Sequence, residues 1–306
     1  MGEHATPKRR NGSVVMVVEE SDALAHGRRV WHAVTDGRNG RMDTSFYDGL
    51  APYYHLIYGD WARAVDEQGA ALSQLLARHG VQPGDPVLDA ACGIGTQTLG
   101  LLQHGHRMAA SDLSPGAVER LQAEAAQRGF KVEARVDDLR ILACAVPGSM
   151  AAVIACDNSI PHLLSDDQLL QCFRSCLRCL RPGGVAVFSV RDYAVIERKH
   201  PDVRPYGLRY DGGSRFLAVQ AWEWDGDQYT VRMYLTSESP EGRCETRVLT
   251  SRYYAVTIDR LIELMREAGF AEIVRRDDVL FQPVITAVAP GTAVRKVQAV
   301  SASASR

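Results

Sequence analysis

The glycine-rich turn Asp89-Ala90-Ala91-Cys92-Gly93-Ile94-Gly95 has the residue types best suited to bind a small ligand. It follows an apolar run, and Gly93 and Gly95 lack a Cβ, so the backbone can turn tightly and a ligand can lie directly against it. A second apolar run ends at Asp112, whose carboxylate can accept hydrogen bonds from ribose hydroxyl groups. The pattern predicts a nucleoside site. Its predicted contacts include the adjoining residues Ala91 and Leu113.

The spacing of the turn favours S-adenosylmethionine (SAM) over a nicotinamide dinucleotide. A dinucleotide turn needs a third glycine three residues after the second, and Thr98 stands at that position. Asp89 lies four residues before Gly93, where its charge would repel a pyrophosphate but tolerate a cationic ligand. SAM carries an ammonium group, a sulfonium group and no phosphate. We therefore predict SAM as the cofactor, with Asp89 among its contacts.

Acidic and polar residues also follow the third and fourth strands that the sequence predicts. Asp138, with Leu139, closes the third strand, where a carboxylate can accept a hydrogen bond from an adenine amino group. The alternative is a solvated loop acid. Cys156 and Asn158 follow the fourth strand, whose end opens onto the ligand crevice because it lies beside the topological switch point. We expect all four residues to contact the cofactor, and Asn158 to contact the substrate as well.

Two basic residues near the same sheet edge are candidates for contacts with the substrate. His162 is predicted to contact the cofactor and to act in catalysis by accepting a substrate proton; the alternative is a buried histidine satisfied by its neighbours. Arg191 follows the apolar strand 185–190, and its guanidinium suits bidentate capture of a substrate carboxylate. The alternative for Arg191 is a structural pair with Asp192 or Asp157.

Aromatic residues gather between residues 47 and 61 and again at 253–254. Aromatic faces stabilise a sulfonium cation once water is excluded, and the alternative is a hydrophobic lid that uses aromatic residues for their area. We predict that Tyr47 and Tyr58 contact the cofactor, that Tyr253 contacts the substrate and that Tyr254 is catalytic.

Three cysteines, Cys172, Cys176 and Cys179, have a spacing that can hold an iron–sulfur cluster. Cluster ligands need a flexible loop that wraps the iron atoms. These cysteines lie instead inside a capped amphipathic helix, where cysteine behaves as a small apolar residue. We therefore predict no metal site.

Strand and helix patterns alternate along most of the chain and predict an α/β, Rossmann-like sheet with helices on both faces. Helices are predicted over 61–80, 96–104, 115–128, 166–180 and 258–268, and strands over 86–91, 107–111, 131–136, 150–156, 185–191, 271–276 and 283–289. Residues 195–250 alternate with a period of two. This alternation predicts an antiparallel insertion of three or four strands after the fifth strand, which we interpret as a substrate lid.

Composition narrows the partners of the chain. A net charge of −2 over 306 residues argues against nucleic acid, and no apolar run is long enough to span a membrane. Seven cysteines without a framework spacing favour a cytoplasmic protein. We expect residues 1–41 to be a mobile leader or an upstream extension of the true start, 42–290 the functional domain and 291–306 a disordered tail. Homo-oligomerisation stays open.

Together these features resemble the class I SAM-dependent methyltransferases, and within them the glycine N-methyltransferase-like group. The shared features are the turn at 89–96, Asp112, the run Asn158-Ser159-Ile160-Pro161-His162-Leu163, the turn Arg181-Pro182-Gly183-Gly184, Arg191-Asp192-Tyr193 and Tyr253-Tyr254.

The resemblance implies a seven-stranded sheet with the last strand antiparallel. It implies that Gly93 and Gly95 lie under the methionine part of SAM, with Asp112 at the ribose and Asp138 at the adenine. His162 and Asn158 would then lie near the methyl donor, and Arg191 would hold a substrate carboxylate. One departure is that the family's arginine for the cofactor carboxylate has no counterpart in register here, although Arg63 lies nearby.

The hypothesis is therefore a SAM-dependent methyltransferase that acts on a small molecule, at the nitrogen of an amino acid or small amine. An ammonium acceptor must first lose a proton, which His162 or a tyrosine can accept. The alternatives are O-methylation of a small metabolite, a non-catalytic SAM-binding protein, and a nicotinamide-dependent reductase.

Overall fold

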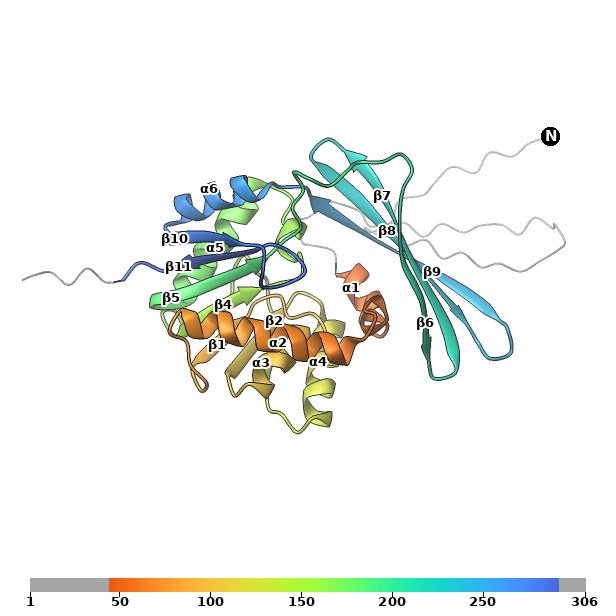
Figure 1. The fold of residues 1–306 in the computed structure, drawn as a ribbon, viewed down its shortest axis with the longest axis horizontal. Coiled ribbons are helices and arrows are strands. Elements are labelled where there is room, and N and C mark those ends of the chain that lie inside the picture. Colours follow the sequence, from red (N-terminus) through yellow and green to blue (C-terminus); the bar gives the residue numbers. More distant parts are fainter. Residues whose placement is uncertain (1–43, 292–306) are drawn as a thin grey trace, which may run out of the picture. The chain divides into compact units, whose positions relative to one another are not determined.

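The computed structural model describes residues 44–291. The predicted leader at 1–41 lies outside the described residues, as does the predicted tail beyond residue 291. The central sheet has seven strands in the order β10-β11-β5-β4-β1-β2-β3; Figure 1 labels all of them except β3. Its strands are β1 (Pro86–Asp89), β2 (Arg107–Asp112), β3 (Glu133–Val136), β4 (Met150–Ala155), β5 (Leu180–Ser189), β10 (Ala271–Arg276) and β11 (Val284–Val288).

The direction of the strands confirms the predicted fold. Strands β5, β4, β1, β2 and β3 are mutually parallel, and β11 runs antiparallel to both β5 and β10. β1 and β4 are neighbours in the sheet. The chain leaves β1 toward β2 on one side of this pair and leaves β4 toward β5 on the other side, so the strand order reverses between β1 and β4. Ligands bind at the carboxyl ends of the strands at such a reversal.

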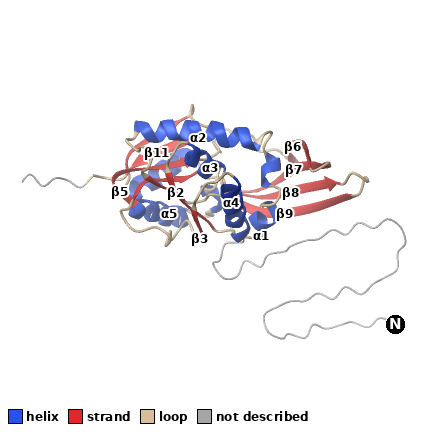
Figure 2. Ribbon diagram, turned by 90° about the horizontal axis from the view of Figure 1, so that it is seen from below, coloured by secondary structure: helices blue, strands red, loops and turns tan. Residues whose placement is uncertain are grey.

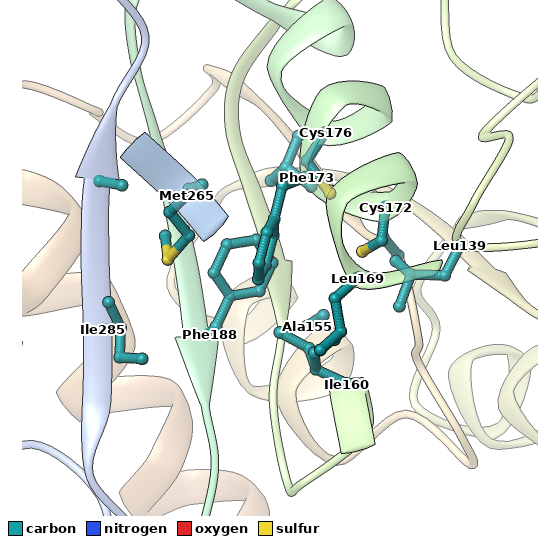
Figure 3. Packing of buried hydrophobic residues seen from close by; sticks show 14 of the residues in the cluster. Leu139, Ala155, Ile160, Leu169, Cys172, Phe173, Cys176, Phe188, Met265 and Ile285 are labelled. Atoms are coloured by element: carbon teal, nitrogen blue, oxygen red, sulfur yellow. The ribbon is translucent and has the colours of Figure 1, made fainter. Parts of the chain in front are cut away.

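Helices cover both faces of this sheet (Figures 1 and 2). α2 (Trp61–Arg78), α3 (Thr96–Gln103) and α4 (Pro115–Gln127) lie on one face, and α5 (Asp166–Cys179) and α6 (Ile258–Ala268) lie on the other. α5 packs with Leu169, Cys172, Phe173 and Cys176, whose spacing places them on one side of the helix. Figure 3 shows Phe173 against Phe188 of β5, with ring centroids 5.3 Å apart. The cysteines are thus buried apolar residues of a helix, as predicted.

The helix that follows the glycine-rich turn, α3, is positioned by its close crossing with α2. A Cβ at Gly100 would lie 2.5 Å from the Val65 carbonyl oxygen and 2.6 Å from Gly69 Cα. A Cβ at Gly69 would meet the Gly100 backbone at 2.5 Å. The two backbones touch because neither position carries a side chain, and this contact holds α3, with the turn at its start, against α2.

The opening helix α1 (Ser45–Leu50) is held to the amino end of α4 by one carboxylate. Asp48 Oδ1 accepts hydrogen bonds from the Ser114 hydroxyl at 2.5 Å and the Gly116 N–H at 3.1 Å. Unpaired N–H groups at a helix start favour an acidic partner. These two hydrogen bonds hold α1, and with it Tyr47, over the carboxyl edge of the sheet.

The predicted insertion is a separate antiparallel sheet in the order β6-β7-β8-β9. Its strands are β6 (Asp202–Asp211), β7 (Ser214–Asp225), β8 (Gln228–Glu238) and β9 (Cys244–Tyr254), so it ends at Tyr254 and not at residue 250. Successive side chains of each strand point to opposite faces of this sheet, and one of the two faces is buried. On β8, each of the side chains of this face is at most 3% exposed: Tyr229, Val231, Met233 and Leu235. This face packs toward α1 and toward Tyr193 after β5.

Other sequence expectations differ from the structure in small ways. α5 ends at Cys179, and the turn predicted at 181–184 is part of β5, with an irregular register where Leu180 pairs with Met150. No helix within residues 44–291 is long and apolar enough to cross a membrane. The cytoplasmic assignment stays a prediction.

We expect Gly100→Ala to lower the free energy of unfolding by about 1–3 kcal/mol, because the added methyl group overpacks the α2–α3 crossing. Helix propensity alone would favour alanine by ~1 kcal/mol. A decrease in the free energy of unfolding would therefore identify the overpacking. Urea unfolding measures the change. Gly59→Ala, in the bend before α2, is a control for an added methyl group that clashes with nothing, since a Cβ there meets no atom within 4 Å. A stabilising effect at Gly100 would contradict the close crossing.

Candidate active site

Two cavities meet at the carboxyl edge of the central sheet. The first, the loop cavity, has a volume of about 570 Å³ and is lined by the glycine-rich turn, Asp112 and the end of β4. The second, the arginine cavity, has about 480 Å³ and lies between the opening helices, the second sheet and residues 279–281. The two cavities share four lining residues: Tyr47, Tyr54, Tyr58 and Asp157.

The two glycines of the turn have different tasks. Both have positive φ, +51° at Gly93 and +99° at Gly95, which favours glycine. A Cβ at Gly93 meets no atom within 4 Å, and Gly93 lines the loop cavity. A Cβ at Gly95 would lie 2.3 Å from Leu121 Cδ1 of α4. Gly93 therefore leaves open space for a ligand, whereas Gly95 is required for packing and, contrary to the prediction, does not line the cavity.

Asp112 holds the turn in place from the end of β2. Its Oδ2 accepts a hydrogen bond from the Gly93 N–H at 2.8 Å, and its Oδ1 accepts one from the Ser114 N–H at 2.9 Å. Burial raises the pKa of the Asp112 carboxyl, and these N–H donors oppose the shift. Asp112 also lines the loop cavity. The position suits the predicted contact with a ribose.

Asp89 is a support for the turn and does not reach the cavity. Its side chain is fully buried, and its Oδ2 accepts a hydrogen bond from the Thr98 hydroxyl at 2.7 Å. Burial raises the pKa of Asp89 to about 7, although the Thr98 bond lowers it. The predicted cofactor contact is therefore replaced by a bond that ties β1 to α3.

The acid pair after β3 is also oriented differently from the prediction. Asp138 does not line the loop cavity, because Arg140 binds its carboxylate, with Nη2 and Oδ2 2.6 Å apart. Asp137, Leu139 and Arg140 line the cavity instead. This ion pair lies within one loop. The carboxylate that was predicted to bind the adenine is therefore bound by a side chain two residues further along the chain.

Asn158 is buried behind the site and does not contact either cavity. It has a positive φ of +64° and is 2% exposed. Its Nδ2 donates to the Tyr193 hydroxyl at 2.9 Å, and its Oδ1 accepts from the Arg191 N–H at 3.0 Å. The predicted cofactor and substrate contacts are replaced by a positioning role, since Asn158 holds the backbone from which the Arg191 side chain extends.

His162 lines the loop cavity, as predicted, within a group of aromatic rings. Its Nε2 lies 2.7 Å from the Tyr47 hydroxyl, and its ring centroid is 4.1 Å from that of Tyr253. Burial, with the nearby charge of Arg191, lowers the pKa of His162 to about 3. The ring is therefore neutral at physiological pH and is a poor acceptor for a proton from an ammonium group.

The two tyrosines at the end of β9 face opposite sides, as neighbours on a strand must. Tyr253 lines the arginine cavity and stacks on Tyr229, with ring centroids 5.1 Å apart and planes at 12°. Tyr254 lies outside both cavities and donates its hydroxyl to Asp166 Oδ1 at 3.0 Å. The predicted substrate residue Tyr253 reaches the site, and the predicted catalytic residue Tyr254 does not.

Arg191 lines the arginine cavity without a carboxylate partner. None of the ion pairs among residues 44–291 includes it: Asp192 pairs with Arg275 at 2.8 Å, and Asp157 accepts hydrogen bonds from tyrosines. The guanidinium lies 5.3 Å from the centroid of the Trp222 ring, close enough for a cation–π contact. The structure therefore excludes both structural pairs that the sequence left open.

Several lining residues escaped the sequence reasoning. Tyr54 and Asp157 line both cavities, although neither was predicted to contact a ligand: Tyr54 was counted only among the aromatic residues at 47–61, and Asp157 was considered only as a partner of Arg191. Tyr206, Gln220 and Met233 line the arginine cavity from β6, β7 and β8. These strands carry only an alternating pattern, which does not say which face meets the sheet edge.

The residues of the loop cavity fit SAM. The open space above Gly93 suits the amino-acid chain of SAM, and the Asp112 carboxylate, whose oxygens each accept one backbone N–H, suits the ribose. The aromatic rings of Tyr47 and Tyr58 suit the sulfonium. The predicted contacts Ala91, Leu113, Leu139 and Cys156 also line this cavity. Arg63 does not, as it is exposed and pairs with Glu67. Within the part of the chain that the structure describes, no group of three or more His, Cys, Asp or Glu side chains is placed to hold a metal.

Comparisons with known proteins agree with this fold and site. Residues 87–184 match the family model for a methyltransferase domain. A glycine/sarcosine N-methyltransferase of Parasynechococcus marenigrum is 28% identical over 134 residues, which are 44% of this chain and 46% of the relative. A ubiquinone biosynthesis O-methyltransferase of Xanthomonas campestris is 32% identical over 107 residues, 35% of this chain and 43% of the relative.

The fold is also that of solved methyltransferases. The structure of SAM-bound CalS10, an amino pentose methyltransferase from Micromonospora echinaspora, superposes with a TM-score of 0.66 and 14% identity, over 79% of this chain and 96% of that one. The matched domain agrees with the class predicted from the sequence, and the chain has the fold of solved SAM-dependent methyltransferases. The chain spans about half the length of the curated relatives it matches.

We expect Asp112→Ala to weaken binding of S-adenosylhomocysteine by about 10- to 100-fold, the effect of losing hydrogen bonds to a charged group. Asp138→Ala should change the affinity much less, because Asp138 faces Arg140 and not the cavity. Isothermal titration calorimetry on both variants measures the two affinities. The opposite ranking would restore Asp138 as the adenine contact.

The low pKa of His162 predicts a specific pH dependence. The pKa of His162 is about 6.5 in the unfolded chain and about 3 in the folded protein. At pH values between these two, the unfolded chain binds a proton at His162 and the folded chain does not. Stability should therefore fall as pH falls through this window, and His162→Gln should show a shallower fall. In the folded protein, NMR should show no titration of the His162 ring between pH 5 and 8. An imidazole shift in that range would refute the assignment.

Proposed function

We propose that the protein transfers a methyl group from SAM to a small molecule, at the nitrogen of an amino acid or small amine. The observation that carries this proposal is Arg191, a cation without an ion-pair partner among residues 44–291, in a cavity that adjoins the loop cavity. A guanidinium in such a place suits a carboxylate of the acceptor, which it can bind with two parallel hydrogen bonds.

The size and lining of the arginine cavity favour an acceptor larger than glycine. Its volume of about 480 Å³ lies in the ordinary range for small-molecule sites, ~300–1,000 Å³. Apolar side chains form much of the wall: Phe46, Leu50, Ile57, Met233 and Leu280. These residues favour an acceptor that has an apolar portion beside its charged groups.

Methyl transfer requires the protein to align the two reactants more than to activate them. SAM supplies a methyl carbon that its sulfonium already activates toward in-line displacement. The protein's part is to hold donor and acceptor in line and to exclude water, effects worth ~7–11 kcal/mol in favourable cases. Tyr47, Tyr54 and Tyr58 lie on the wall that both cavities share, so they shape the opening through which the two reactants meet.

The alternative acceptor is an oxygen, as in the O-methyltransferase relative. A hydroxyl acceptor needs a base to remove its proton. Among the histidines within residues 44–291, only His162 lines either cavity, and its lowered pKa makes it a weak base. The site therefore favours nitrogen over oxygen, because an ammonium group loses a proton to a weak base far more readily than an alcohol hydroxyl does.

The test is turnover by the purified protein with methyl-labelled SAM and a panel of amino acids, small amines and hydroxy acids. The proposal expects transfer to at least one amino acid or amine that has an apolar portion. S-adenosylhomocysteine binding without transfer to any acceptor would indicate a non-catalytic SAM-binding protein. Tighter binding of NAD than of SAM would indicate a nicotinamide-dependent enzyme.

For the best carboxylate-bearing acceptor, we expect Arg191→Met to raise KM by about 10- to 150-fold, since a hydrogen bond to a charged group contributes ~1.5–3 kcal/mol. Affinity for S-adenosylhomocysteine should stay within about twofold, because Arg191 lines only the arginine cavity. Arg232→Met, a substitution on β8 outside both cavities, where the guanidinium pairs with Glu223, is the matched control. An unchanged KM would remove Arg191 from substrate binding.

A further inference from the structure

Asp157 has an unusual place in the molecule, directly after β4 at the junction of the two cavities. Its φ is +58° and that of the next residue, Asn158, is +64°. The Asp157 N–H donates to Ser189 Oγ at 2.7 Å, and the Asn158 N–H donates to the Ser189 carbonyl at 3.0 Å. Two successive residues in the left-handed region are held against the end of β5, and such strain is concentrated at functional sites.

The Asp157 carboxylate is only partly satisfied by the protein. Its Oδ2 accepts hydrogen bonds from the Tyr58 hydroxyl at 2.8 Å and from the Tyr54 hydroxyl at 3.4 Å. Its Oδ1 has no donor, and the carboxylate forms no ion pair, among residues 44–291. An anion without a countercharge at the wall of a cavity suits a cationic ligand group.

Asp157 can accept a proton from an ammonium group where the buried His162 ring cannot, because the transfer neutralises the Asp157 carboxylate but would place a new charge on His162. Burial, together with the charge of Asp157, raises the pKa of both Tyr54 and Tyr58 well above their ordinary value, so both phenols remain protonated donors. Burial also raises the pKa of the other titratable neighbours, Tyr47, Tyr206 and Cys156. None of these groups supplies a positive charge.

We propose that Asp157, held by the hydroxyl groups of Tyr54 and Tyr58, binds the ammonium group of the methyl acceptor and accepts its proton. This inference rests on the function proposed above and names the residue that prepares the acceptor. Asp157 lines both cavities, so an acceptor nitrogen beside it lies where donor and acceptor must meet.

The sequence of bonds balances without another reactant. One N–H bond of the ammonium breaks and its proton forms an O–H bond on the Asp157 carboxylate, leaving a neutral amine. The amine lone pair then forms the N–CH3 bond as the S–CH3 bond breaks, and that electron pair stays on sulfur. The N-methylammonium product leaves, and the Asp157 proton passes to water.

Two physical effects favour the proton transfer. Removing an ammonium–carboxylate pair from water disfavours both charges, and the pair can relieve this cost by becoming neutral. A sulfonium in the adjoining cavity repels an ammonium beside it and lowers the pKa of the acceptor nitrogen. Arg191, of opposite charge to Asp157, lines the same arginine cavity. The two residues therefore suit the carboxylate and the ammonium of one amino-acid acceptor.

The test compares wild type with Asp157→Asn, using the amino acid that the turnover panel identifies and the hydroxy acid of the same skeleton. Calorimetry in the presence of S-adenosylhomocysteine gives the affinity for each. We expect wild type to prefer the amino acid by at least about tenfold and the variant to lose this preference, with kcat/KM falling by about 100- to 10,000-fold, the usual contribution of a general base. Asp167→Asn, outside both cavities on α5, should match wild type.

Asp157→Gly provides a second variant, because a φ of +58° suits glycine and removing the side chain relieves backbone strain. It should fold, bind S-adenosylhomocysteine within about threefold of wild type, and lose the preference for the amino acid. A preference retained in both variants would overturn the role of Asp157. Failure of the proposed function differs from this result, since it would appear as an absence of amine methylation in wild type.

Discussion

The reversal of strand order between β1 and β4 is the constraint on which the site depends. Because the crossovers leave these neighbouring strands in opposite directions, the chain diverges after Asp89 and after Ala155 and leaves a hollow between the two segments. The glycine-rich turn lies on one side of the hollow and Asp157 on the other. Every later feature, including the opening helices and the second sheet, encloses this hollow and restricts what enters it.

Enclosure is achieved by aromatic rings that also hold charged groups in place. Trp222, Tyr229, Tyr253 and His162 form consecutive ring contacts from β7 to the loop cavity, with centroids 4.1–5.1 Å apart. Arg191 lies against Trp222, and the Tyr193 hydroxyl joins Tyr229 to Asn158. These rings surround Arg191, which has no ion-pair partner among residues 44–291, and apolar surroundings strengthen the interaction of such a cation with an anionic group.

Much of the architecture could be predicted because it depends on local patterns. The alternation of strands and capped helices located most element boundaries within a few residues, and the turn at Gly93 and the acid at Asp112 identified the loop cavity. Three of the predicted site residues that line neither cavity have one cause in common. Asp138, Asn158 and Tyr254 are polar residues at suitable chain positions, but Arg140, Arg191 N–H and Asp166 bind them in the folded protein. Which partner a polar group finds is not contained in spacing.

Local patterns were enough to predict the succession of strands and helices along the chain, the class of cofactor and a cation after β5, because periodicity, backbone freedom at glycine and residue charge are local properties. The folded protein was needed to show which of two adjacent side chains faces the site, as for Tyr253 and Tyr254, and that Arg191 has no ion-pair partner among the described residues. Those outcomes depend on how the second sheet packs against the first, and long-range packing leaves no periodic trace in the chain.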